Sequence, residues 1–218
     1  MTKLATLVVI AFIVLLGAGG AEAVTETWTF NVPDGNQGTE RVFTATSGGT
    51  DNLTLHAYLA SDNSGNPPVT DALLWGKNDG PGETGVGVCP AGTITDDCGT
   101  SEIDVNEYIR VDFDSLLLSN VQFTIGSLQT GEGFQIYTSS SDTAFNTGSL
   151  CASGTGEPVE QTASCTGLSR YAFVRASNTD VVLETISGTP VPEPATMFLG
   201  GLGLIAFGYA ARRRLFGR

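Results

Sequence analysis

The sequence predicts an all-β domain, an antiparallel β-sandwich of jelly-roll type, with an apolar helix at each end of the chain. Three observations predict this fold class. Short runs within residues 24–190 place apolar side chains at every second position, which is the period of a half-buried strand. Turn-forming Gly, Asn, Asp and Pro residues separate these runs, and both ends of the chain are apolar. A closed β-barrel is the alternative for the same pattern.

The alternation begins at Trp28, Phe30 and Val32, whose neighbours are Thr and Asn. The same period recurs at Leu53-Leu55-Ala57, Ile109-Val111-Phe113, Val121-Phe123-Ile125, Phe134-Ile136, Tyr171-Phe173 and Val181-Leu183. Segments such as Asp34-Gly35-Asn36 and Gly131-Glu132-Gly133 have the composition of turns. We therefore expect about nine or ten short strands in one domain over residues 24–190.

The charge of the chain limits its partners. The sequence has 10 basic and 23 acidic side chains and a formal net charge of -13. Residues 24–190 hold 5 of the basic and 21 of the acidic side chains, a net charge of -16. Because phosphate binding needs Lys and Arg gathered on one face, this composition argues against nucleic acid as a partner.

The first 23 residues have the parts of a secretory signal peptide. Lys3 precedes thirteen uncharged, mainly apolar residues at 4–16, and the small residues Ala21 and Ala23 follow. Thirteen residues are too few for a membrane-spanning helix, which needs about 20. We expect export by Sec-type machinery and cleavage by signal peptidase after Ala23.

The C-terminal segment, residues 191–218, combines three features in a fixed order. A short motif comes first, then seventeen uncharged residues at 195–211, which just suffice to span a bilayer, and then an arginine cluster. The residues that carry this pattern are Val191, Pro192, Glu193 and Pro194, followed by Arg212, Arg213 and Arg214. The arginines predict a cytoplasmic end for a transmembrane helix, which leaves the preceding domain on the periplasmic side.

These same residues closely resemble the PEP-CTERM sorting signal, because a plain membrane anchor does not explain a Pro-Glu-Pro immediately before the helix. The resemblance implies processing by an exosortase, a membrane cysteine peptidase of Gram-negative bacteria often encoded beside exopolysaccharide genes. It also implies an intermediate anchored in the inner membrane, then a protein at the cell surface or outside the cell.

The four cysteines of an exported chain are expected to form disulfides. Three pairings are possible. The sequential pairing of Cys89 with Cys98 and of Cys151 with Cys165 is favoured, since each pair flanks a Gly-rich loop. A zinc site is disfavoured because the single histidine, His56, is distant in sequence.

Nine acidic residues lie between Asp79 and Asp114, a density that suits calcium or a solvated acidic rim. Flexible Gly-containing loops with carboxylates can hold calcium, although this segment lacks the ligand ladder of an EF-hand. The calcium ligands that we predict are Asp96, Asp97, Glu102 and Asp104. No other cofactor is expected.

Aromatic side chains offer a second kind of candidate site. A platform on which sugars stack could draw on Trp28, Trp75, Tyr58, Tyr108, Tyr137 and Tyr171. Trp75 is the favoured stacking residue, because it ends an apolar run beside a turn. Packing within the sheet is the alternative role for these rings.

Catalysis is not expected, because the chain has one histidine and no G-x-S-x-G motif for an activated serine. The sequence and the resemblance together predict an exported cell-surface or matrix protein, a non-catalytic module associated with exopolysaccharide or another envelope component. A calcium-stabilised adhesive or structural module is the first alternative. A carbohydrate-active enzyme with two carboxylates in a cleft is the second.

Overall fold

The computed structural model describes residues 24–60, 69–90, 98, 101–114, 116–143, 148–191, 201, 203, 204 and 208. Within these residues it contains fifteen strands and no long helix. The strands are β1 (Glu26–Thr29), β2 (Gly35–Asn36), β3 (Glu40–Thr44), β4 (Asn52–Ala60), β5 (Val69–Asp71), β6 (Leu73–Asn78), β7 (Thr84–Cys89), β8 (Ile103–Asp104), β9 (Glu107–Asp112), β10 (Leu118–Gly126), β11 (Gly133–Ser139), β12 (Ser149–Thr155), β13 (Gln161–Cys165), β14 (Tyr171–Ala176) and β15 (Asp180–Pro190).

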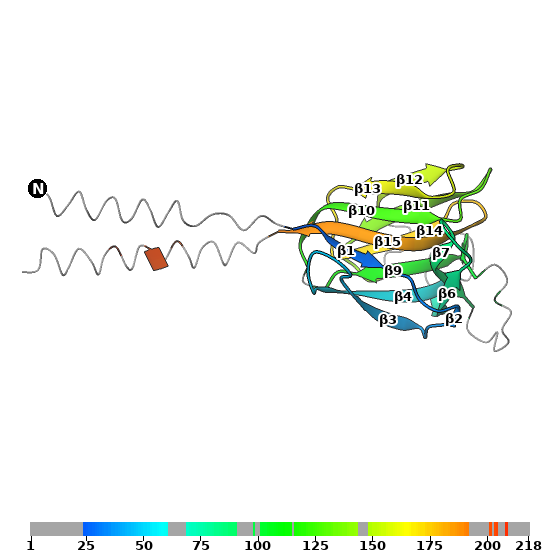
Figure 1. The fold of residues 1–218 in the computed structure, drawn as a ribbon, viewed down its shortest axis with the longest axis horizontal. Coiled ribbons are helices and arrows are strands. Elements are labelled where there is room, and N and C mark those ends of the chain that lie inside the picture. Colours follow the sequence, from blue (N-terminus) through cyan, green and yellow to red (C-terminus); the bar gives the residue numbers. More distant parts are fainter. Residues whose placement is uncertain are drawn as a thin grey trace, which may run out of the picture.

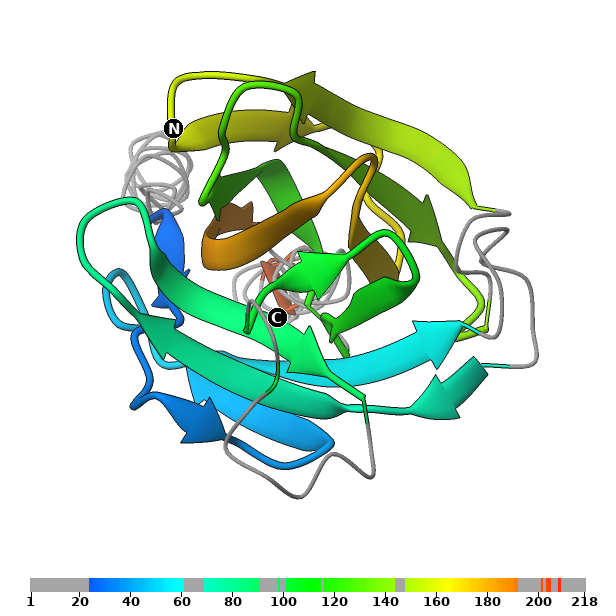
Figure 2. The ribbon, with the colours of Figure 1, turned by 90° about the vertical axis from the view of Figure 1, so that its right-hand side faces the viewer.

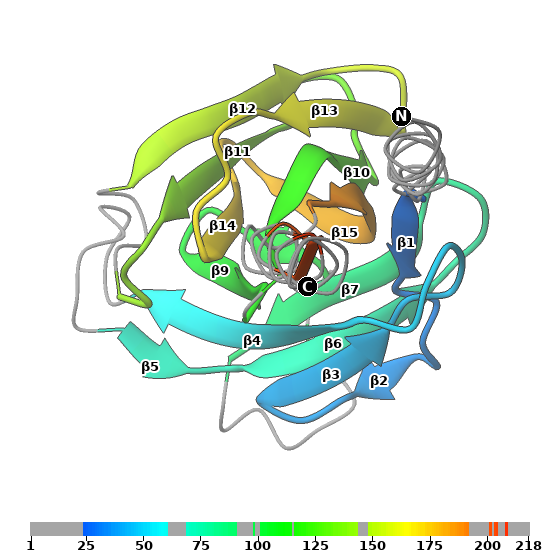
Figure 3. The same cartoon turned by 90° about the vertical axis from the view of Figure 1, so that its left-hand side faces the viewer.

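The strands form two antiparallel sheets that pack face to face (Figures 1 and 3). Sheet A has eight strands in the order β13-β10-β15-β7-β6-β2, with β1 and β8 also paired to β15. Sheet B has seven strands in the order β12-β11-β14-β9-β4-β3, with β5 paired to β4. The predicted all-β sandwich is therefore confirmed. The finer jelly-roll arrangement stays a prediction, and several sequential strands, such as β6 with β7, pair within one sheet.

The core between the sheets consists of the apolar side chains that the alternation predicted. Trp28, Leu55 and Phe123, from three different strands, are fully buried there. Burying each large apolar side chain contributes about 1.5–3 kcal/mol relative to exposure. Viewed along the strands, both sheets curve around this core (Figure 2).

The strand count differs from the expected nine or ten. Three of the additional strands, β2, β5 and β8, have only two or three residues. Two others, β12 and β13, lie around the segment between Cys151 and Cys165, which the sequence suggested to be a Gly-rich loop. Both consist mostly of small and polar residues and lie at the edges of the sheets, so they lack the apolar alternation of buried strands.

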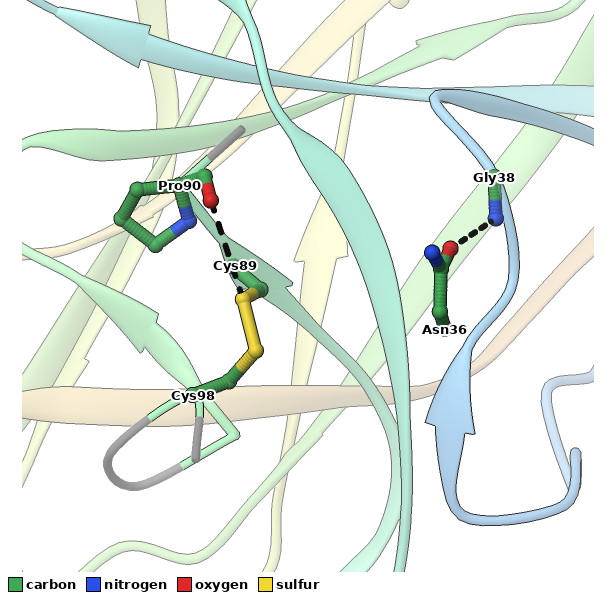
Figure 4. Close-up of a disulfide and its surroundings, with 5 residues drawn as sticks. All are labelled: Asn36, Gly38, Cys89, Pro90 and Cys98. Carbon is green, nitrogen blue, oxygen red and sulfur yellow. Dashed lines mark hydrogen bonds between the residues drawn. A yellow bond between two sulfur atoms is a disulfide. The ribbon is translucent and has the colours of Figure 1, made fainter. Parts of the chain in front are cut away.

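Both disulfides have the predicted pairing. Cys89, the last residue of β7, is bonded to Cys98, and its Sγ lies 3.9 Å from the carbonyl oxygen of Pro90 (Figure 4). The second bond joins Cys151 of β12 to Cys165 of β13. Since β12 belongs to sheet B and β13 to sheet A, this bond joins the two sheets at one edge of the sandwich.

Peptide mapping under non-reducing conditions is expected to recover two linked peptide pairs, one with Cys89 and Cys98 and one with Cys151 and Cys165. The reason is that each pair already meets in the folded chain. A peptide that links Cys89 to Cys165 would contradict the structure.

The N-terminal and C-terminal strands lie side by side. Glu26 of β1 is in register with Gly188 of β15, so β1 begins and β15 ends at the same end of the sandwich (Figure 1). Among the described residues, no helix has the length and apolar character needed to cross a membrane. The predicted signal peptide at 1–23 lies outside the described residues, as does most of the predicted transmembrane helix at 195–211.

Candidate functional site

The outer face of sheet B carries a group of aromatic side chains. Because side chains alternate between the two faces of a strand, the residues between the core positions of β4, β9, β14 and β11 all point to this face. We call this group the tyrosine face, and its rings are Tyr58, Tyr108, Tyr137, Tyr171 and Phe173. Strand pairing places Tyr58 opposite Tyr108, and Phe173 opposite Tyr137.

Arg110 of β9 lies at the centre of the tyrosine face. Its guanidinium carbon is 5.2 Å from the ring centre of Tyr58 and 5.5 Å from that of Tyr171, distances typical of cation–π contacts. Strand pairing places His56 beside it on β4 and Phe173 on β14. The charged group is thus held between rings on two neighbouring strands.

His56 connects the rings to two carboxylates. Its ring stacks on Tyr58 with centres 4.3 Å apart. Its Nδ1 is 3.2 Å from Glu40 Oε2, and its Nε2 is 3.2 Å from Asp71 Oδ1. Both imidazole nitrogens are therefore engaged by acidic side chains, which fixes the orientation of the imidazole ring.

Two further arginines complete the face. Arg175 Nη1 donates to Tyr108 Oη at 2.9 Å, and Arg170 pairs with Asp112 at 3.3 Å. Together with Arg110, they are three of only five basic side chains within residues 24–190. The tyrosine face therefore holds most of the domain's basic side chains, beside the acidic side chains of Glu40, Asp71 and Asp112.

The rings of the tyrosine face lie at two depths. Tyr108 and Phe173 are fully buried and Tyr171 is nearly so, whereas Tyr58 and Tyr137 are half-buried. The buried rings form a rigid floor, and the half-buried rings present edges and faces beside charged hydrogen-bonding groups. A sugar ring needs this combination of apolar surface and fixed donors and acceptors.

The C-terminal end of the domain leads directly into the predicted sorting segment. The amide of Val191 donates to the carbonyl oxygen of Leu117 at 2.7 Å, immediately after β15 ends. The family model for the PEP-CTERM protein-sorting motif matches residues 190–214. The chain carries a PEP-CTERM sorting motif.

This match confirms the resemblance seen in the sequence. The PEP-CTERM motif identifies an exported protein that passes through a membrane-anchored intermediate and has an exosortase as its processing partner. Of its predicted residues, Val191 is described and exposed, and the others, Pro192 to Pro194 and Arg212 to Arg214, lie outside the described residues. The same holds for Ala21 and Ala23. Comparison with curated proteins gives no match to the chain.

The aromatic residues that the sequence suggested as one platform divide between three places in this PEP-CTERM protein. Trp28 is fully buried in the core, and the four tyrosines lie on the outer face of sheet B. Trp75 lies on β6 of sheet A, half-buried, opposite Asn36 and Gly87. The structure therefore separates the favoured stacking residue from the tyrosines.

The predicted calcium ligands also lie in different surroundings. Glu102 is only 6% exposed and accepts a hydrogen bond from Lys77 Nζ at 2.5 Å, with Ser127 donating to the same carboxylate. Asp104 is exposed, and its carboxylate accepts from the amide of Val105. Asp96 and Asp97 lie outside the described residues. No group of three metal-ligating side chains occurs within the described part of the chain.

One carboxyl pair bears on the alternative of a carbohydrate-active enzyme. Glu184 on β15 is buried, and Glu160 is the charged group that acts on its carboxyl. Burial, and then the charge of Glu160, raises the pKa of Glu184 to about 7. Glycoside hydrolysis needs two carboxyls that face a substrate in a cleft, so the burial of Glu184 does not favour that chemistry.

Sequence reasoning missed Arg110, Arg170, Arg175 and His56 as parts of the tyrosine face. The sequence shows that Arg110 and His56 alternate with the apolar residues of their strands, which places both side chains on the outer face. Their meeting on one face depends on the order β4-β9-β14-β11, which joins segments up to about 120 residues apart.

Proposed function

We propose that this exported PEP-CTERM protein is a non-catalytic module that binds exopolysaccharide through the tyrosine face of sheet B. The observation that carries the proposal is Arg110 held between Tyr58 and Tyr171, beside a histidine fixed by two carboxylates. Rings supply apolar surface for the faces of sugar rings, and the arginines and carboxylates supply directed hydrogen bonds to hydroxyl groups.

The position of the tyrosine face would leave it accessible while the domain is attached to the membrane through its C-terminal segment. The termini leave one end of the sandwich, whereas sheet B runs along its side (Figures 1 and 3). This sheet carries the tyrosine face. A polysaccharide chain would therefore reach the face while the domain is attached on the periplasmic side, and also after its delivery to the cell surface.

Replacing Tyr58 with Ala is expected to weaken binding to the native exopolysaccharide about 2- to 13-fold, since one aromatic contact contributes about 0.5–1.5 kcal/mol. Affinity electrophoresis of the exported full chain through gels that contain the polysaccharide measures this change. Neutral and acidic polysaccharide fractions run in parallel show which chemistry the face prefers.

The matched control is Trp75→Ala, which removes a half-buried ring from β6 in the other sheet. This variant is expected to migrate as the unchanged protein does. Loss of binding in Trp75→Ala with binding retained in Tyr58→Ala would move the site to Trp75, and absence of binding by the unchanged protein would refute the proposal.

A further inference from the structure

One oxygen of a buried carboxylate near the start of the domain has no hydrogen-bond partner among the described residues. Glu26 of β1 lies on the same face of the strand as the core residue Trp28, and its side chain is only 6% exposed. Its Oε2 atom is buried and has no hydrogen-bond partner among the described residues. A buried carboxylate oxygen without a partner destabilises the fold, so we expect a further group to neutralise it.

The loop between β3 and β4 closes around this carboxylate. The amide of Thr27 donates to the carbonyl oxygen of Ser47 at 3.1 Å, which holds the loop against β1. At Gly49 a Cβ atom would lie 1.7 Å from Glu26 Oε1, and Gly48 has a φ of +84°. Gly48 is required, because a side chain there would meet the backbone of Thr25 and its φ is positive, whereas a side chain at position 49 would displace the Glu26 carboxylate.

A second carboxylate comes from the same loop. Asp51 acts on Glu26: burial, and then the charge of Asp51, raises the pKa of the Glu26 carboxyl, while a hydrogen bond from the backbone of Asp51 opposes this rise. The backbone of Asp51 is fixed, since its carbonyl oxygen accepts from Trp28 Nε1 at 2.9 Å and from the amide of Ala45 at 2.9 Å. No basic side chain forms a salt bridge with either carboxylate in the part of the chain that the structure describes.

We propose that Glu26 and Asp51 bind a divalent cation, Ca²⁺, between β1 and the 45–51 loop. Calcium takes six to eight oxygen ligands in flexible geometry, so two carboxylates, loop carbonyl groups and water suffice. Mg²⁺ is disfavoured because it requires a nearly ideal octahedron. The inference goes beyond the proposed binding of polysaccharide, and its site differs from the acidic segment where the sequence predicted calcium.

The proposed site lies near the end of the last strand, where a bound cation would hold the first strand in place. Glu26 is in register with Gly188, two residues before the end of β15, which leads into the PEP-CTERM motif. A cation there fastens the first strand and the 45–51 loop beside the last strand. Modules outside the cell commonly bind Ca²⁺ with Kd values of about 10⁻⁴–10⁻³ M, which is adequate for this role.

Calcium is expected to raise the Tm of the full chain, purified in detergent after treatment with EDTA, by about 3–5 °C at a concentration near ten times Kd. The shift should vanish in Glu26→Gln and in Asp51→Asn. It should persist in Asp104→Asn, which removes an exposed carboxylate of the acidic segment. Sodium chloride at matched ionic strength controls for charge screening.

Terbium provides a readout that does not depend on stability. Tb³⁺ occupies oxygen-rich calcium sites and luminesces when a nearby indole is excited, and the indole of Trp28 is hydrogen-bonded to Asp51. We expect Tb³⁺ luminescence that Ca²⁺ displaces, that Asp51→Asn abolishes and that Trp75→Phe retains. If Glu26→Gln fails to fold, Asp51→Asn decides the outcome.

Two results would overturn the proposal. A calcium shift that is unchanged in Glu26→Gln and Asp51→Asn places the cation elsewhere. No shift and no luminescence in the unchanged protein means that Glu26 and Asp51 share a proton instead of a metal ion.

Discussion

Replacing Lys77 with Met is expected to lower the free energy of unfolding by about 3–5 kcal/mol, the usual cost of breaking a buried ion pair from one side. Lys77 Nζ lies 2.5 Å from Glu102 Oε1 and 3.1 Å from Glu83 Oε2, and the Lys77 side chain is 10% exposed. Without the ammonium group, Glu102 stays buried, and the hydroxyl of Ser127 is its one remaining side-chain donor among the described residues. Urea denaturation of the full chain measures the loss.

Two further variants identify the source of this effect. In the double variant Lys77→Met/Glu102→Gln no charge remains buried, so most of the lost stability should return. Arg170→Met breaks the pair with Asp112, in which the Arg170 side chain is 50% exposed, and should cost less than 1 kcal/mol. A loss in Lys77→Met no larger than that in Arg170→Met would show that the Lys77 pair contributes no more than a surface contact.

Lys77 and Glu102 also show why sequence reasoning placed calcium in the acidic segment. The sequence shows the charge of Glu102 but not its burial, and the partner lies 25 positions earlier on another strand. Glu26 was overlooked although alternation places it on the same face as Trp28, because a single acid at the start of a strand shows its charge but no sign of burial. Burial and pairing arise from tertiary contacts, and local pattern does not encode them.

The sequence predicted the features that depend on residues close together in the chain, namely the sorting motif and the buried positions of the strands. The sorting motif is linear, so its order of Pro-Glu-Pro, apolar segment and arginines can be recognised without a fold. The core positions of β4 and β10 follow from alternation, because one face of each strand must be buried. The tyrosine face required the pairing of β4, β9, β14 and β11, whose order follows from long-range topology.

Stability is expected to fall as the pH rises from about 4.5 to above 7, and Glu107 is a main cause. Glu107 is 6% exposed, and burial, followed by the charges of Asp104 and Asp180, raises its pKa to about 7. The folded protein therefore holds a proton that the unfolded chain, with a carboxyl pKa near 4.5, releases in this range. The raised pKa of Glu107 contributes about 3 kcal/mol to the free energy of unfolding. This contribution is complete below pH 4.5 and is lost as the pH passes 7.

Glu107→Gln tests this assignment, because a glutamine keeps an oxygen that can accept from the amide of Asp104, now 2.9 Å from Glu107 Oε2, but cannot ionise. Urea denaturation at several pH values, with EDTA present to remove cations, should show the variant matching the unchanged protein at pH 4.5 and exceeding it at pH 8. The free energy of unfolding of the variant should still depend somewhat on pH, since Glu184 also has a pKa raised to about 7.

The matched control, Glu157→Gln, removes an exposed carboxylate and should leave the slope of the free energy of unfolding against pH unchanged. Equal slopes in Glu107→Gln and the unchanged protein would mean that Glu107 is already ionised in the folded state, with Asp104 and Asp180 too distant to oppose its charge.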